Sequence, residues 1–250
     1  MKREGIYLST IDENAQLLAD TYGLGLEIAE FCTAWNMDLE YEKTDEIVRS
    51  KIGKVALKLL HAPFNELFPC AIDPKARELA RQRYHQAIDL ARQYGAEKVI
   101  IHGGYNPWLY FPVWYKSQSV VFWKEFLQED PGVDIVLENV LEEEPDMLTD
   151  IVREVDHPRL GICLDVGHAN SYSKASPMEW LEKCAPWLSH VHLHNNDGSW
   201  DTHSPLDEGT IPVKELLIRL EALCPKATIT LELMDAEASL QWLKEELEWI

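Results

Sequence analysis

Eight short apolar runs, each followed by a loop and an amphipathic stretch, alternate along this 250-residue chain. Short runs rich in Val, Ile and Leu are typical of strands buried on both faces of a parallel sheet. Eight strands that alternate with eight helices predict an α/β fold, a single (β/α)8 TIM barrel spanning residues 1–250. The predicted strands are Ile6–Ser9, Leu24–Ile28, Ala56–Leu60, Lys98–Ile101, Ile135–Leu137, Gly161–Leu164, Val191–Leu193 and Thr228–Leu231.

Helix start and stop signals lie between these runs. Asp73 stands before a proline in the first helical position, and Gly95 ends the amphipathic stretch that follows. An open doubly wound sheet is the alternative fold, but it usually has a Gly-rich turn after an early strand, and this sequence has none. The same signals predict helices opened by Ser176-Pro177 and with Pro212 in the first turn, and a last helix over Ala236–Trp249.

Charge and cysteine usage restrict the classes of partner. The chain has 43 acidic and 23 basic residues, a formal net charge of -20, which disfavours nucleic acid because DNA affinity comes mostly from Lys and Arg. Five scattered cysteines without a CxxC pair indicate reduced thiols and a cytoplasmic protein. The sequence has no apolar run of about 18 residues and no signal-peptide pattern at its start, so no membrane association is expected.

Metal-ligand residue types end the third to eighth predicted strands. Strand carboxyl ends are where barrel enzymes place reacting groups, and carboxylates packed in one mouth repel each other unless a cation lies between them. The mixture of imidazole and carboxylate favours Zn, Mn, Fe or Co over Ca. These strand-end residues are His61, His102, Glu138, Asp165, the set His190, His192 and His194 on the seventh strand, and Glu232.

The adjoining loops supply further candidate ligands. His168 follows Asp165 by three positions, and Asp201 and His203 form an Asp-x-His pair after the seventh strand. Among the three histidines of the seventh strand, we favour His192 as the ligand. His194 is the alternative ligand and a candidate substrate contact, and His190 is expected to lie deeper in the barrel.

The ordered series HAPF, HGG, LENV, LDVGHA, HVHLHNND, DTHSPLDEGTI and LEL resembles the xylose isomerase-like barrel superfamily. That group includes sugar phosphate isomerases and epimerases and the AP endonuclease family 2 enzymes such as endonuclease IV. The resemblance covers nearly the whole chain and is clearest from Ala56 to Leu233. It departs at Asp207, where the family often has Gly.

The resemblance implies two ligand sets. In epimerase-like members one Mn or similar ion is held at positions that match Glu138, Asp165, His192 and Glu232, and the two glutamates move the proton of the sugar carbon. In endonuclease IV a trinuclear zinc site uses nine ligands. One to three Zn or Mn ions are therefore expected here, and the nine matching positions are His61, His102, Glu138, Asp165, His168, His192, Asp201, His203 and Glu232.

The loops favour a small carbohydrate substrate. The loop after the second strand, EFCTAWNMDLEYEK, has no Arg, whereas the DNA enzymes use Arg-bearing loops. The loop after the fourth strand is rich in aromatic residues, whose faces pack against the C–H surfaces of sugars. Tyr105 and Trp108 of that loop, with Glu27 and Trp35 near the second strand, are candidate substrate contacts.

Three functions are compatible with these features. The first is a metal-dependent isomerase or epimerase in which Glu138 and Glu232 are the catalytic acid and base. The second is a multinuclear zinc phosphoester hydrolase resembling endonuclease IV, and the third is a sugar-binding barrel without turnover. We predict the first, and the sequence leaves homo-oligomerisation open.

Overall fold

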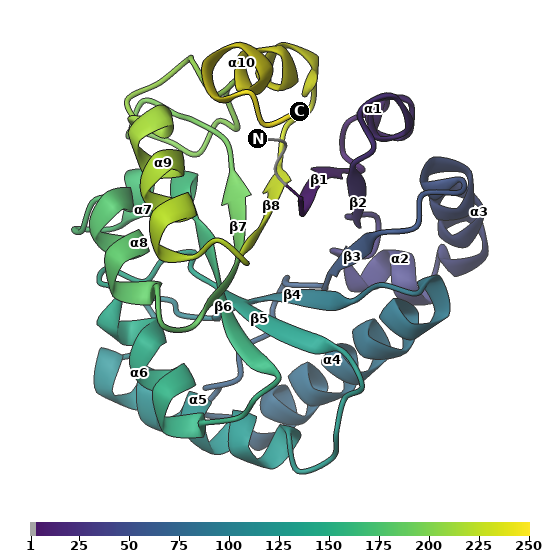
Figure 1. Cartoon of the computed structure of the whole chain (residues 1–250). Helices are drawn as coiled ribbons and strands as arrows, with labels where there is room; N and C mark the ends of the chain where they lie inside the picture. The colour runs from purple at the N-terminus through teal and green to yellow at the C-terminus, as the bar shows by residue number, and fades with distance from the viewer. Residues whose placement is uncertain (1–3) are drawn as a thin grey trace.

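The computed structural model describes residues 4–250, and its eight parallel strands close into a barrel in the order β1 to β8, with β8 pairing on β1 (Figure 1). The helices lie outside the strands, so the (β/α)8 barrel expected from the sequence is confirmed. The strands are β1 (Ile6–Ser9), β2 (Gly25–Ile28), β3 (Lys58–His61), β4 (Lys98–His102), β5 (Asp134–Glu138), β6 (Leu160–Asp165), β7 (Leu188–Leu193) and β8 (Thr228–Leu231).

Strand ends differ from the sequence-based expectation where a ligand-type residue is itself paired. β3, β4, β5 and β6 each extend to include the His, Glu or Asp that was expected to follow the strand. His102 pairs with Glu138, and Asp165 pairs with His192 in the parallel ladder. Only β1 and β8 have the predicted bounds, because backbone pairing with neighbours, which a single segment does not reveal, decides where a strand ends.

The helix signals act locally as expected, with two differences. The Asp73 side chain accepts from the Lys75 N–H at 2.8 Å, and the Ser176 side chain forms a capping box with Glu179. Pro212 precedes its helix instead of lying in the first turn. The connections from β2 to β3 and from β6 to β7 contain two helices each, which gives ten helices over residues 4–250 where eight were expected.

The helices are α1 (Ala15–Tyr22), α2 (Ala34–Asp38), α3 (Tyr41–Ile52), α4 (Pro74–Tyr94), α5 (Pro112–Phe126), α6 (Asp146–Val155), α7 (Val166–Tyr172), α8 (Pro177–Cys184), α9 (Val213–Leu223) and α10 (Glu237–Leu247, shorter than the predicted Ala236–Trp249). Within residues 4–250, none of them combines the length and apolar character that crossing a bilayer requires.

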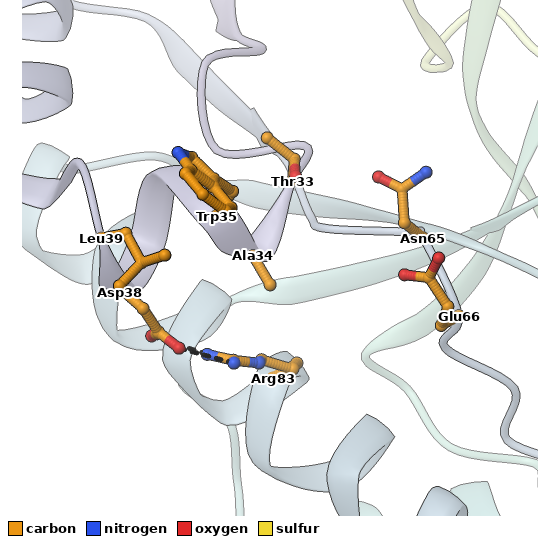
Figure 2. Close-up of a pocket in the computed structure, with 8 residues that line it drawn as sticks. All are labelled: Thr33, Ala34, Trp35, Asp38, Leu39, Asn65, Glu66 and Arg83. Carbon is orange, nitrogen blue, oxygen red and sulfur yellow. Dashed lines mark hydrogen bonds and ion pairs between the residues drawn. The ribbon is translucent and has the colours of Figure 1, made fainter.

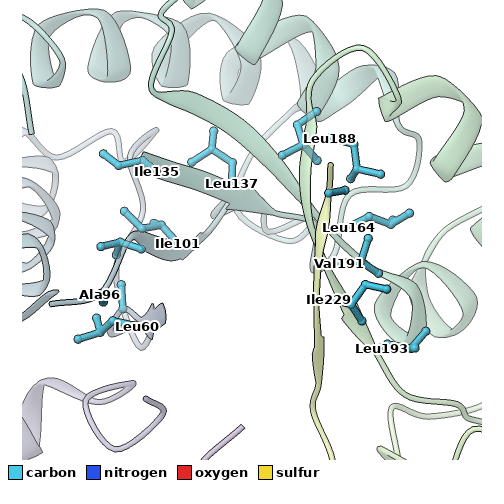
Figure 3. Close-up of a cluster of buried hydrophobic side chains, with 14 of the residues drawn as sticks. Leu60, Ala96, Ile101, Ile135, Leu137, Leu164, Leu188, Val191, Leu193 and Ile229 are labelled. Atoms are coloured by element: carbon cyan, nitrogen blue, oxygen red, sulfur yellow. The ribbon is translucent and has the colours of Figure 1, made fainter. Parts of the chain in front are cut away.

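Apolar side chains fill two regions of the molecule. The larger region lies between the strands and the surrounding helices, and Figure 3 shows part of it. A smaller cluster fills the inside of the barrel and consists of Tyr7, Leu59, Ile100, Val136 and Cys163. Side chains two residues apart on a strand share a face. The residues two positions beyond this inner cluster therefore also face the barrel interior, and they include His61, His102, Glu138 and Asp165.

Candidate metal centre

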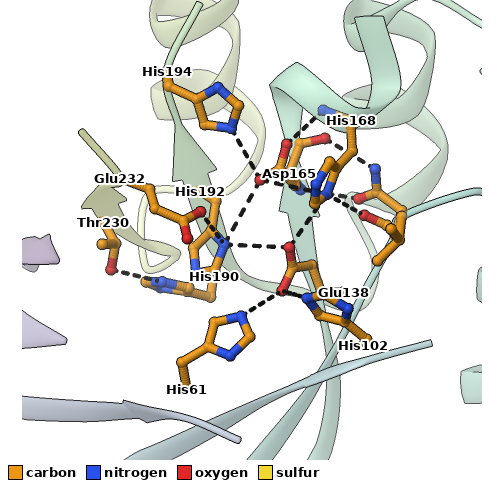
Figure 4. A network of polar contacts seen from close by, with 12 residues as sticks. His61, His102, Glu138, Asp165, His168, His190, His192, His194, Thr230 and Glu232 are labelled. Atoms are coloured by element: carbon orange, nitrogen blue, oxygen red, sulfur yellow. Dashed lines mark hydrogen bonds and ion pairs between the residues drawn. The ribbon is translucent and has the colours of Figure 1, made fainter. Parts of the chain in front are cut away.

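The Glu138 carboxylate lies among four imidazoles. Its Oε2 is 3.3 Å from Nε2 of His61 and 3.6 Å from Nε2 of His102. Its Oε1 is 3.3 Å from Nδ1 of His168 and 3.4 Å from Nδ1 of His192 (Figure 4). Only 1% of the Glu138 side chain is exposed. Four strands and the start of α7 thus contribute to one buried polar cluster.

His192 presents its Nδ1 atom to three carboxylates. Nδ1 lies 3.0 Å from Oε2 of Glu232, 3.4 Å from Oε1 of Glu138 and 3.7 Å from Oδ2 of Asp165. The atom is buried and makes no hydrogen bond. A nitrogen that faces three acidic oxygens without a partner is suited to share a cation with them.

Asn139 fixes the position of Asp165. The Asp165 N–H donates to the Asn139 side-chain oxygen, and the Asn139 amide donates to the Asp165 carbonyl, each at 2.9 Å. The Asp165 carboxylate also accepts from the His168 N–H at 2.6 Å, which caps α7. Sequence reasoning gave Asn139 no role. The sequence feature that could have indicated a role for Asn139 is its position directly after Glu138 in the LENV motif.

The loop after β7 returns Asp201 and His203 to the same mouth. Asn195 and Ser204 form an antiparallel bridge, with N–H···O distances of 2.9 and 2.8 Å, that closes this loop. Asp201 Oδ2 is 2.9 Å from Nε2 of His203 and 3.4 Å from Nε2 of His168. His203 has a positive φ of 48°, and such unfavourable backbone conformations cluster at functional sites.

Carboxylates and imidazoles in the cluster shift one another's pKa values. Burial opposes ionisation of Glu232, but the charge of His192 outweighs it and lowers the pKa of Glu232 to about 2. Likewise His102 and His192 outweigh burial at Glu138 and hold its pKa well below the usual range. Burial disfavours charge on His192, yet the surrounding acids raise its pKa well above normal. Without a metal, protons balance the charge that a cation would otherwise balance.

The donor set fits one or more transition-metal ions. Besides Nδ1 of His192, the buried Oε2 of Glu138 and Nδ1 of His194 have no hydrogen-bond partner. Mixed nitrogen and carboxylate donors suit zinc or manganese. Several triads have ligand atoms within 4.8 Å of one another, among them Cys163–His190–His192, His61–His102–Glu138, His61–His192–Glu232, Glu138–Asp165–His168 and His194–Asp201–His203.

The sequence model of the family described as xylose isomerase-like TIM barrel matches residues 18–250. The chain belongs to this family. A protein of Methanocaldococcus jannaschii named MJ1311 and described as uncharacterized is 34% identical over 210 residues, which cover 76% of this chain and 70% of MJ1311.

Two solved structures of similar proteins superpose over almost the whole barrel. A D-tagatose 3-epimerase-like protein is 27% identical, with a TM-score of 0.78 over 98% of this chain and 97% of its own. The TTHB071 protein of Thermus thermophilus, whose crystal was soaked with ZnCl2, is 26% identical, with a TM-score of 0.78 over 98% of both chains. The resemblance to the xylose isomerase-like family inferred from the motifs is therefore confirmed.

All nine residues that the resemblance singled out as ligands lie in this one cluster. Of the two alternative ligands, His192 of β7 faces Glu138, Asp165 and Glu232, whereas His194, just beyond β7, contacts Asp165 at 3.1 Å and stacks on His203. His190 lies deeper in the barrel, as expected.

Apart from His194, the candidate substrate contacts lie outside the cluster or beneath it, and the roles of all of them stay predictions. Tyr105 is buried against Tyr115, whereas the Trp108 side chain is 82% exposed. Trp35 lines a cavity of about 450 Å³ beside the Asp38–Arg83 ion pair, and no residue of the nine-ligand set lines it (Figure 2). Glu27 is fully buried and its carboxylate contacts other side chains of the barrel interior.

Proposed function

We propose that this chain is a divalent-metal-dependent isomerase or epimerase that acts on a small sugar, sugar acid or sugar phosphate. The observation that carries the proposal is that Glu138 and Glu232, from β5 and from the end of β8, approach the same Nδ1 atom of His192. The similarity to a D-tagatose 3-epimerase-like protein supports this class of reaction. Two carboxylates beside one substrate can act as the base that removes a proton next to a carbonyl and as the acid that supplies one from the other side.

Glu138, Asp165, His192 and Glu232 are the residues that would hold the first metal ion. A divalent metal bound there would polarise a substrate carbonyl and hold an adjacent hydroxyl oxygen. The chain itself supplies the rigid frame for those ligands, because Asn139 fixes Asp165 and backbone pairing fixes Glu138 and His192. A frame held in this way keeps the substrate carbon in a constant position relative to both glutamates.

The two glutamates differ in a way that suits different roles. Glu232 has 16% of its side chain exposed, whereas Glu138 has 1%, so Glu232 is the more accessible to a bound sugar. A pKa of about 2 keeps Glu232 ionised at neutral pH, ready to accept the proton of the carbon beside the carbonyl. In an isomerisation Glu232 would return this proton to the neighbouring carbon. In an epimerisation Glu138, which is ionised, would first have to take up a proton and would then give it to the same carbon from the opposite face.

Replacing Glu232 with Gln tests this assignment. The amide keeps the shape but cannot accept the carbon-bound proton, so exchange between that carbon and deuterated water should stop while the barrel remains folded. Glu142→Gln is the matched control, because Glu142 is also buried but contacts Tyr115 and the Val140 N–H instead of the cluster. Exchange at the wild-type rate in Glu232→Gln would remove Glu232 from the role of base.

A metal-dependent phosphoester hydrolase is the second candidate function. Asp201 and His203, from the loop after β7, add candidate metal ligands to the four that would hold the first ion. The pairing of three lysines argues against a DNA substrate. Lys43 of α3, Lys116 of α5 and Lys174 between α7 and α8 each contact a carboxylate, which leaves their charge partly neutralised. Three zinc ions per chain by elemental analysis together with cleavage of abasic DNA would favour the hydrolase. One ion per chain and no cleavage would favour the isomerase.

A further inference from the structure

A second polar network lies directly beneath the metal-facing side of His192. The Nε2 atom of His192 hydrogen-bonds to Oε2 of Glu27 at 3.3 Å and lies 3.1 Å from its Oε1. Oε2 of Glu27 also accepts from the Thr230 hydroxyl at 2.5 Å and contacts Nε2 of His190 at 3.2 Å. His190, His192, Glu27 and Thr230 are all fully buried. No water competes for these contacts, so their donors and acceptors must match one another.

The contacts of Glu27 require a proton on Nε2 of both histidines. On its other side, Nδ1 of His190 lies 2.7 Å from the Thr228 hydroxyl, which accepts from Lys98 Nζ at 2.9 Å and lies 3.3 Å from the Ser189 carbonyl oxygen. Nε2 of His190 faces acceptors only, namely Oε2 of Glu27 at 3.2 Å and, at 3.0 Å, the oxygen of Thr230, whose own proton goes to Glu27, so Nε2 of His190 carries a proton. An ionised carboxylate only accepts hydrogen bonds. His192 must therefore also present an N–H to Glu27 through its Nε2.

This proton on Nε2 determines whether the other ring nitrogen of His192, Nδ1, has a free lone pair. A ring that binds a metal must be neutral, and a neutral imidazole with its proton on Nε2 has its lone pair on Nδ1, the atom that faces Glu138, Asp165 and Glu232. With the proton on Nδ1 instead, the same atom would be unable to bind a cation. Histidine ligands of metals commonly donate their other N–H to a carboxylate, which fixes both the ring and its tautomer.

We propose that Glu27 is a positioning residue for the metal centre: its carboxylate accepts the Nε2 proton of His192 and so directs the Nδ1 lone pair towards the ligand cluster. Glu27 would act through His192 without touching the metal or the substrate. This inference rests on the metal centre of the proposed function. It also gives Glu27 a role different from the substrate contact expected from the sequence.

The test compares Glu27→Gln with Glu30→Gln. Each variant removes one carboxylate near the end of β2, but Glu30 contacts Thr10 and Lys51 and no residue of the cluster. The first measurement is zinc affinity by competition with a chelator. The second is the tautomer of His192 in the zinc-loaded protein, from nitrogen-15 chemical shifts of its ring.

Glu27→Gln should bind zinc about 10- to 100-fold more weakly, because the amide offers N–H groups where three donors now converge on a carboxylate. It should also lose the uniform protonation of Nε2 on His192. Glu30→Gln should keep wild-type affinity within about twofold. Glu27→Asp retains the carboxylate at a longer reach, so it should lose less affinity than Glu27→Gln and keep the Nε2 proton.

Wild-type zinc affinity and an unchanged His192 tautomer in Glu27→Gln would overturn the proposal. Circular dichroism and thermal melting establish that each variant is folded. If Glu27→Gln does not fold, Glu27→Asp decides alone: an Nδ1-protonated His192 in that folded variant, despite its carboxylate, would refute the positioning role. A wild-type protein that binds no divalent metal would instead refute the proposed metal dependence, so the two failures are distinguishable.

Discussion

Raising the pH from 6.5 to 9 should destabilise the metal-free protein and leave the zinc-loaded protein as stable or more stable. Burial disfavours charge on His203, but the hydrogen bond that its ring donates to the Asp201 carboxylate outweighs burial and raises the pKa of His203 to about 9. The pKa values of His168 and His192 are raised in the same direction by their neighbouring carboxylates, against the effect of burial. A raised folded-state pKa stabilises the protein below the unfolded value of 6.5, and this stabilisation is lost as the pH rises through the folded value.

The size of the stability loss in the metal-free protein can be worked out from the pKa of His203. A rise in pKa from 6.5 to about 9, at about 1.4 kcal/mol for each tenfold change in proton affinity, corresponds to at most about 3.5 kcal/mol of unfolding free energy. Zinc reverses the sign because it replaces these protons, and its apparent affinity increases as the imidazoles deprotonate. At a free zinc concentration 100 times the dissociation constant, binding adds about 2.7 kcal/mol.

Urea unfolding of chelator-stripped and zinc-loaded protein at pH 6.5, 7.5, 8.25 and 9 measures how the unfolding free energy of each form changes with pH. His203→Gln should remove much of the loss seen in the metal-free protein. His85→Gln, whose ring stacks on Phe126 away from the cluster, should leave that loss unchanged. A metal-free wild-type protein equally stable at pH 6.5 and 9, or a His203→Gln variant with the wild-type slope, would refute the coupling between these imidazoles and carboxylates.

Two further predictions concern single positions. Gly167→Ala should weaken zinc binding by about tenfold or more, because a Cβ there would lie 1.9 Å from the His194 ring and 2.8 Å from Asp201 Oδ1. Wild-type affinity in a chelator competition would contradict this. Trp108→Ala should change the unfolding free energy by no more than about 0.5 kcal/mol, since the side chain is 82% exposed, but should raise KM for the sugar. Val113→Ala, 78% exposed at the start of α5, should change neither, and an unaltered KM in Trp108→Ala would remove Trp108 from the substrate site.

The sequence by itself determined the architecture and the residues that converge at the barrel mouth. Alternation of apolar runs with amphipathic stretches is a local property, so it is readable without coordinates and predicted β1 and β8 with their observed bounds. Parallel strands of one barrel end at the same rim, so His61, Glu138 and Asp165 had to approach one another once the fold was known.

Tertiary structure alone set the different surroundings of His192 and His194 and the place of Glu27. The strand register sets Asp165 opposite His192, and Nδ1 of His192 then faces Glu138 and Glu232. His194 lies beyond the end of β7 and contacts Asp165 and Asp201. Glu27 looked available to a substrate because a sequence does not show what fills the barrel interior. Its carboxylate faces inward from β2 and meets residues more than 160 positions away along the chain. Such contacts depend on how the barrel closes, and no local pattern of residues encodes them.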